Sequence, residues 1–252
     1  MDFTGKVVIV TGASSGIGAA TAKLFASYGA LLTLVGRNEE RLLRVAEACE
    51  QAKGNKPISL LLDLTQNNSC EEVVRKTVET YKKLDVLINC AGKVVLSTLF
   101  DNDMDGLDEI IAINLRVPYR LTQLCLPHLT TSKGNIVNVF GAPMRSRPGF
   151  TPFCMIRDAL ERFTKFGGLE IAPVGVRMNA VRPGITRTNF LSNFNISEDV
   201  MDQVYEVISQ VVPTEKIIEP EEIARMILFT SSDICPNLNA ANLVVDGAAS
   251  WS

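Results

Sequence analysis

A glycine-rich segment near the start of the chain has the composition and the context of a phosphate-binding loop. It reads Thr11-Gly12-Ala13-Ser14-Ser15-Gly16-Ile17-Gly18 and lies at the end of the apolar run Lys6–Thr11. Glycines let a backbone turn tightly and approach a pyrophosphate, whose charge is stabilised at the N-terminus of the following helix. A purely structural turn is the alternative. The residues expected to bind a dinucleotide here are Gly12, Ser14, Ser15, Gly16, Ile17 and Gly18.

The second expected strand ends in Val35-Gly36-Arg37-Asn38, without a carboxylate. A site that prefers NAD places an acid about twenty residues after the glycines, where it binds the ribose 2′-hydroxyl. Arg37 instead offers a guanidinium that can pair with a 2′-phosphate. The alternative is a surface arginine that opens a helix. We therefore expect NADP(H) as the cofactor, with Arg37 and Asn38 in its site.

Short β-branched runs alternate with longer helical segments along the whole chain, and this alternation must position the residues above. The expected strands are 6–11, 31–36, 58–63, 85–91, 135–140, 176–181 and 242–245. The expected helices are 15–28, 39–53, 70–82, 103–114, 116–129 and 151–172. Such an order gives parallel strands with helices on both faces. The sequence thus predicts an α/β fold, with residues 1–252 forming a single domain around a Rossmann-type doubly wound parallel sheet.

Further motifs, in the correct order, resemble those of the short-chain dehydrogenase/reductase family. Thr11–Gly18 has the family's TGxxxGIG spacing, Asn89-Cys90-Ala91-Gly92 resembles its NNAG segment, and Asn114 matches its catalytic asparagine. Asp63-Leu64-Thr65 resembles the segment with the family's adenine-contacting acid. Pro183-Gly184-Ile185-Thr186-Arg187-Thr188 resembles the PGxxxT segment that holds the nicotinamide carboxamide. Val245-Asp246-Gly247 resembles the family's last strand. The resemblance adds to the expected cofactor site Asp63, Leu64, Asn89, Ala91, Gly92, Pro183, Gly184, Ile185, Thr186 and Thr188.

The resemblance breaks down at the catalytic residues. Members of the family reduce a carbonyl by hydride transfer while a tyrosine donates the proton. A lysine four residues later lowers the tyrosine pKa, and a serine orients the substrate. Here Phe153 stands at the tyrosine position, Arg157 at the lysine position, and Phe140-Gly141 where the serine is expected. Phenylalanine has no proton to give and arginine stays charged, although Arg157 could still bond a ribose hydroxyl.

Two functions follow from an intact cofactor half beside a degenerate triad. The first is a protein that binds NADP(H) and acts as a sensor, scaffold or non-catalytic subunit. The second is an active NADP-dependent oxidoreductase on a hydrophobic carbonyl of ketone, steroid or 3-oxoacyl type, with water or Asn114 as proton source. We favour the first. An interaction protein without a cofactor is hard to reconcile with the glycine loop and Arg37.

Segment 188–213 corresponds to the mobile lid of the family and is rich in apolar residues. It favours a hydrophobic small-molecule ligand, or it forms an amphipathic helix that packs on its own core. The helices near 116–129 and 151–172, which pair across a two-fold axis in the family, carry apolar residues beyond one face. We therefore expect a homodimer or homotetramer, or a hetero-oligomer with an active relative.

Composition excludes several other classes of function. The net charge of −3 comes from interspersed acids and bases, so no basic stripe is available for nucleic acid. The chain has one histidine, His128, and its six cysteines form no CxxC pair, so we expect no metal site. No apolar run is long enough for a membrane span and the start does not resemble a signal peptide. We expect a cytoplasmic protein with reduced thiols.

Overall fold

The computed structural model describes residues 1–53, 55–102, 104–143, 148–188 and 198–251. Its centre is a seven-stranded sheet in the order β3-β2-β1-β4-β5-β6-β7, with every neighbouring pair parallel. The strands are β1 Val7–Thr11, β2 Leu31–Gly36, β3 Ile58–Leu61, β4 Val86–Asn89, β5 Asn135–Val139, β6 Arg177–Pro183 and β7 Asn242–Val245. The predicted α/β fold with a doubly wound parallel sheet is thereby confirmed.

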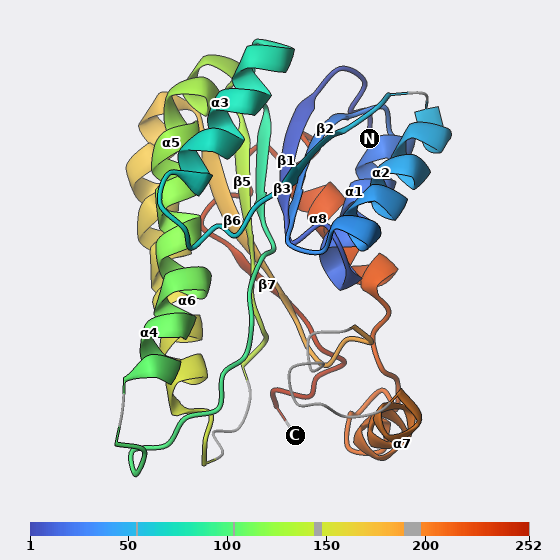
Figure 1. The fold of residues 1–252 in the computed structure, drawn as a ribbon, viewed down its shortest axis with the longest axis vertical. Coiled ribbons are helices and arrows are strands. Elements are labelled where there is room, and N and C mark those ends of the chain that lie inside the picture. Colours follow the sequence, from blue (N-terminus) through green and yellow to red (C-terminus); the bar gives the residue numbers. More distant parts are fainter. Residues whose placement is uncertain (54, 103, 144–147, 189–197, 252) are drawn as a thin grey trace.

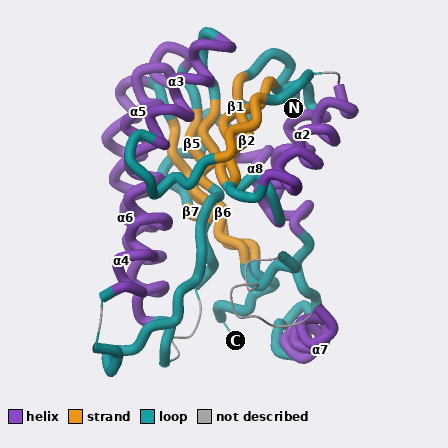
Figure 2. The backbone as a smooth tube through the Cα atoms, in the orientation of Figure 1, coloured by secondary structure: helices purple, strands orange, loops and turns teal. Residues whose placement is uncertain are grey.

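Helices cover both faces of the sheet, as Figures 1 and 2 show. The α-helices are α1 Gly16–Ser27, α2 Glu39–Lys53, α3 Ser69–Tyr81, α4 Asp105–Ile111, α5 Val117–Ser132, α6 Thr151–Ile171, α7 Glu198–Ser209 and α8 Pro220–Ser231. One layer holds α1, α2 and α8, and the other holds α3, α4, α5 and α6 (Figure 1). A hydrophobic cluster lies beneath each layer, because strands such as β1 are buried on both sides.

Most predicted elements are found within two or three residues of their expected bounds, with two differences. Helices 103–114 and 116–129 are not separate, because a π-helical turn over Ala112–Arg116 joins α4 to α5. Helix α8 was not predicted at all. It begins with Pro220 at its first position and a capping box between Glu219 and Glu222, which are helix-start signals present in the sequence.

Candidate functional site

The carboxyl ends of β1, β4, β5 and β6 bring the predicted motifs to one edge of the sheet. The Thr11 hydroxyl accepts hydrogen bonds from the backbone N–H groups of Cys90 at 2.9 Å and Ala91 at 3.0 Å. A Cβ on Gly12 would lie 3.0 Å from the Ala91 backbone, and one on Gly16 would lie 3.0 Å from the Thr188 side chain. The glycine loop, segment 89–92 and segment 183–188 therefore meet where parallel sheets bind nucleotides.

The glycine loop has the geometry that a pyrophosphate needs. Gly12 has a φ of +68°, which favours glycine, and a Cβ on Gly18 would lie only 2.2 Å from the Gly12 carbonyl oxygen. Ser15 precedes α1, but its side chain makes no capping hydrogen bond, and the first turn of α1 holds no acidic residue. The first N–H groups of α1 thus have no side-chain cap, and the helix dipole favours an anion there. These residues fit a dinucleotide.

Arg37 lies at the end of β2, facing the end of β3. Its guanidinium is 3.7 Å from the Asp63 carboxylate, and 70% of its side chain is exposed. Burial alone would raise the pKa of Asp63, but hydrogen bonds from Thr65 and the charge of Arg37 outweigh it, so this pKa is lowered. The Asn38 side chain bonds the first turn of α2, since its Oδ1 accepts the Arg41 backbone N–H at 2.9 Å.

Segment 89–92 is held from behind by a buried chain of hydrogen bonds. Asn89 Nδ2 donates to Asn138 Oδ1 at 2.9 Å, and Asn138 Nδ2 donates to Thr164 Oγ1 at 3.1 Å, which links β4, β5 and α6. Next to Asn89, burial raises the pKa of the Cys90 thiol to about 12. Cys90 therefore stays a neutral thiol near pH 7.

Asn114 lies in the π-helical turn and fastens the loop after β4. Its Nδ2 donates to the Lys93 carbonyl oxygen at 2.8 Å, and its Oδ1 accepts the Lys93 backbone N–H at 3.0 Å. The side chain thus bonds one backbone position in both directions. It holds segment 91–93 beside the cofactor edge.

The positions that the sequence predicts to replace the family's triad lie close together. A Cβ on Gly141 would be 3.6 Å from the Phe153 ring, and Phe140 is buried in a cluster with Ile110 and Leu160 against which Phe153 also packs. A side chain at position 141 would therefore contact the Phe153 ring. Sequence spacing alone left Phe140 and Gly141 open, because one residue along a strand reverses the facing of a side chain.

Arg157, one turn along α6 from Phe153, is buried with 7% of its side chain exposed. Its Nη1 donates to the Ala142 carbonyl oxygen at 3.3 Å, and its Nε and Nη2 lie 3.3 Å and 3.4 Å from Asp158 Oδ1. These bonds are long. The Arg157 guanidinium thus lies against the loop after β5.

Sequence reasoning missed a second buried arginine at this site. Arg182 of β6 has 3% of its side chain exposed and forms an ion pair with Glu161 of α6. Its Nε donates to the Gly141 carbonyl oxygen at 3.4 Å, and its guanidinium carbon lies 5.0 Å from the centre of the Phe140 ring. The signal in the sequence is a second arginine in the strand Arg177–Pro183, directly before Pro183.

Segment 183–188 closes the edge of the site. Thr186 Oγ1 donates to the Gly184 carbonyl oxygen at 3.0 Å, and Ile185 is partly exposed. Tyr205 of α7, also missed from the sequence, fixes the end of this segment. Its hydroxyl accepts the Thr188 backbone N–H at 3.3 Å and donates to the Thr188 carbonyl oxygen at 3.1 Å.

The expected lid is described in part. Residues 189–197 lie outside the described residues, and from residue 198 the segment forms helix α7. Tyr205 of α7 is buried, while Val207 and, just after the helix, Val211 are exposed. The described half of the segment is thus a helix that packs by one face, one of the two expected forms.

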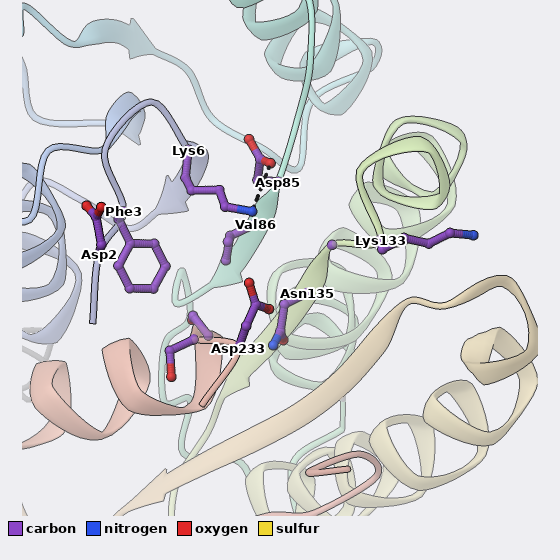
Figure 3. A pocket seen from close by; sticks show the side chains of 11 residues that line it. Asp2, Phe3, Lys6, Asp85, Val86, Lys133, Asn135 and Asp233 are labelled. Carbon is purple, nitrogen blue, oxygen red and sulfur yellow. Dashed lines mark ion pairs between the residues drawn. The ribbon is translucent and has the colours of Figure 1, made fainter. Parts of the chain in front are cut away.

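A small cavity lies away from this site, at the amino end of the strands (Figure 3). It measures about 30 Å³, enough for about one water molecule. Lys6 pairs with Asp85 beside it at 3.6 Å. Elsewhere, no group of three or more metal-ligating side chains is found among the described residues. In the same described ranges, no helix is long and apolar enough to cross a membrane.

Comparisons with known proteins agree with this arrangement. Residues 12–249 match the family model described as enoyl-(acyl carrier protein) reductase. The 3-oxoacyl-(acyl-carrier-protein) reductase of Thermotoga maritima is 31% identical over 249 residues, covering 98% of both chains. The meso-2,3-butanediol dehydrogenase of Serratia marcescens is 28% identical over 253 residues, covering 100% of this chain and 97% of that one.

Solved structures show the same likeness. A Caenorhabditis elegans short-chain dehydrogenase/reductase of unknown function, solved with cofactor, superposes with a TM-score of 0.94 at 30% identity. The match covers 99% of this chain and 96% of that one. The chain belongs to the short-chain dehydrogenase/reductase family, which binds a nicotinamide cofactor.

Proposed function

We propose that this chain is an NADP(H)-binding member of the family that lacks ordinary carbonyl reductase activity and acts as a sensor, scaffold or non-catalytic subunit. The observation that carries the proposal is the pairing of Phe153 with Gly141, the two positions where the family has its tyrosine and serine. The glycine loop, by contrast, keeps the geometry of a pyrophosphate site. Binding residues are kept and proton-donating residues are replaced.

The chemical reason lies in the charge that hydride transfer creates. A bound nicotinamide supplies a hydride, and a carbonyl that receives it becomes an alkoxide, which needs a proton or a hydrogen-bond donor as it forms. Phe153 offers neither. The Cys90 thiol has a raised pKa of about 12, and the Asn114 amide bonds Lys93. Loss of one positioned acid typically costs about 10²–10⁴ in rate.

The preference for NADP(H) rests on the end of β2. No carboxylate follows Gly36, and Arg37 stands where a 2′-phosphate would bind. Arg37 is held only loosely, by an exposed pairing with Asp63 at 3.7 Å, so it can move to an incoming phosphate. We assign the remaining cofactor contacts to the glycine loop and to segments 63–64, 89–92 and 183–188, with Arg157 near the ribose.

An active NADP-dependent oxidoreductase is the second candidate. The relatives above are named as a reductase and a dehydrogenase, and the Asn114 turn is intact. In that case a water held near Asn114 would donate the proton, and the substrate would be a hydrophobic carbonyl that suits the apolar lid. An unassisted water is a poor acid near neutrality, so turnover would be slow.

We further propose one NADP(H)-binding domain over residues 1–252 that assembles as a homodimer, a homotetramer or a hetero-oligomer with an active relative. Exposed Phe166 and Leu169 on α6 support this assembly. All six cysteines are unpaired, which suits a reducing compartment such as the cytoplasm.

The proposal is tested by titrating the purified protein with NADPH and NADH and then adding a panel of ketones and alcohols. We expect NADPH to bind and NADH to bind at least several-fold more weakly, with no detectable oxidation of bound NADPH. Failure to bind either cofactor would contradict the proposal, and so would rapid turnover.

A further inference from the structure

A basic groove lies beside the glycine loop, between α1, α2 and the start of α8. It has a volume of about 360 Å³ and includes Ser14, Ser15 and Gly16 of the loop. Small side chains of α1, Ala19 and Ala20, form part of its lining. Its cationic lining residues are Lys23, Arg41, Arg44 and Arg187, and the lining carboxylate is Glu221. In a protein of net charge −3, this groove concentrates positive charge at one place.

The far wall of this groove is held in place. Arg187 lies 3.4 Å from Glu219, and its guanidinium carbon is 4.9 Å from the centre of the Tyr205 ring. Thr188 is bonded in both directions by the Tyr205 hydroxyl. The groove is therefore built by fixed elements on this side.

The arginines in and beside the groove differ in whether a carboxylate already pairs with them. Arg44 pairs with Glu40, one turn earlier on α2, and Arg187 pairs with Glu219. Arg37, which lies outside the groove, is paired with Asp63. The guanidinium of Arg41 makes no ion pair or hydrogen bond within the described ranges, and only its backbone N–H is engaged, by Asn38. Among the arginines that line the groove, Arg41 is therefore the one without an ion pair to a carboxylate of the described residues.

Ser14 connects the groove with the end of β2, where the 2′ position of a bound adenosine ribose is expected. A Cβ on Gly36 would lie 3.1 Å from the Ser14 hydroxyl, so Ser14 contacts both the end of β2 and the groove. Arg41, Ser14 and Ser15 thus line one groove next to the position expected for the ribose. A guanidinium with hydroxyl donors is a donor set for a phosphate monoester.

We propose that Arg41, together with Ser14 and Ser15, binds the 2′-phosphate of NADP(H) in this groove and determines the cofactor preference more strongly than Arg37. This inference rests on the proposed cofactor. It assigns a specificity-determining role to a residue that the glycine motif and the end of β2 do not indicate.

The test compares two probes that differ by the 2′-phosphate, adenosine 2′,5′-bisphosphate and 5′-AMP, by calorimetry. The variants are Arg41→Ala, Arg37→Ala and, as a control outside the groove, Arg75→Ala, which removes a paired, exposed arginine of α3. We expect Arg41→Ala to weaken binding of the bisphosphate by about tenfold or more, with 5′-AMP unchanged. Arg37→Ala should weaken it less, Arg75→Ala should leave it unchanged, and Arg41→Lys should keep binding only in part.

The outcomes separate this inference from the proposed cofactor. If the unmodified protein prefers the bisphosphate and only Arg37→Ala removes that preference, the role of Arg41 is overturned while NADP(H) stands. If the unmodified protein binds both probes equally, the NADP(H) proposal and the role of Arg41 both fall. Arg41 is exposed, and thermal melting of each variant verifies that its fold is intact.

Discussion

At the scale of residues, Phe140 and Gly141 pack together with an ion pair between the buried Arg182 and the partly buried Glu161. Arg182 lies over Phe140 and bonds the Gly141 carbonyl oxygen, while Glu161 supplies its countercharge. Removing one partner of such a pair leaves a buried charge without compensation, which is more destabilising than losing the attraction alone. These contacts tie the loop after β5 to β6 and α6.

The pH dependence of stability should report this pair. A hydrogen bond from Lys165 and the charge of Arg182 lower the pKa of Glu161, although its burial opposes them. A carboxyl whose pKa is lower in the folded state stabilises the fold above its unfolded pKa, and this stabilisation is lost as pH falls through the folded pKa. Glu161→Gln should therefore lower the free energy of unfolding at pH 7 by about 1–3 kcal/mol. It should also flatten the loss of stability below about pH 5.

Urea unfolding at neutral and acidic pH measures both effects. Glu79→Gln is the matched control, since Glu79 forms an exposed ion pair with Arg75 on α3 and should change stability by less than about 1 kcal/mol. An unchanged pH profile in Glu161→Gln would show that Glu161 does not compensate Arg182.

The sequence assigns Phe153 and Arg157 to the family's tyrosine and lysine positions, because the flanking Pro148-Gly149 and Ala159-Leu160 set the spacing. It could not choose between Phe140 and Gly141, since that choice depends on which way the backbone faces after β5. Arg182 was out of reach for a different reason. Its partner Glu161 lies twenty-one residues away, and only the packing of α6 on β6 brings them together.

At the scale of elements, the glycines of α6 show why local propensity misleads. Glycine weakens a helix by about 1 kcal/mol relative to alanine, so Gly167 and Gly168 look unfavourable. The structure gives the reason for Gly168. A Cβ there would lie 3.1 Å from the backbone of Ala240, and the Gly168 carbonyl oxygen accepts Asn239 Nδ2 at 2.9 Å. The glycine lets α6 approach the chain before β7.

Gly168→Ala should therefore destabilise the protein by about 1–3 kcal/mol despite its better helix propensity. Gly167→Ala is the control in the same turn. Its Cβ would meet the flexible end of Met178, which can move, so the effect should be small. Thermal and urea unfolding compare the two, and equal stability of both variants would refute the close-approach argument.

At the scale of the whole molecule, an apolar surface on α5 and α6 remains without a partner in one chain. Phe166 is 63% exposed and Leu169 is 71% exposed. Tyr119 of α5 is also exposed, and its ring centre lies 5.3 Å from that of Phe163 on α6. Other apolar residues of these helices, Leu121 and Leu160, are buried and belong to the core. The exposed set has the character of an interface between subunits.

We expect light scattering at micromolar concentration to show a dimer or a tetramer. Phe166→Asp with Leu169→Asp should shift the protein to a smaller species, because charges would then face each other in an apolar contact. Leu43→Asp, on the exposed side of α2, should leave the assembly unchanged. A monomer in the unmodified protein would refute the proposed assembly.

The alternation of strands and helices made the overall fold predictable, since parallel strands with helical crossovers allow few arrangements. The position of α8 could not be predicted in this way, although Pro220 and Glu222 mark its start. Its place in the layer with α1 depends on contacts between segments far apart in the chain.

The central claim is that the cofactor site is kept while proton donation is lost, and the rate of NADPH oxidation tests it most directly. With NADPH bound and ketones in excess, the unmodified protein should show no turnover, or a rate at least about a thousandfold below an ordinary family member. The variant Gly141→Ser, Phe153→Tyr, Arg157→Lys should gain measurable turnover, because a hydroxyl at 141 would face one at 153. Reduction of a ketone by the unmodified protein at several per second would contradict the account.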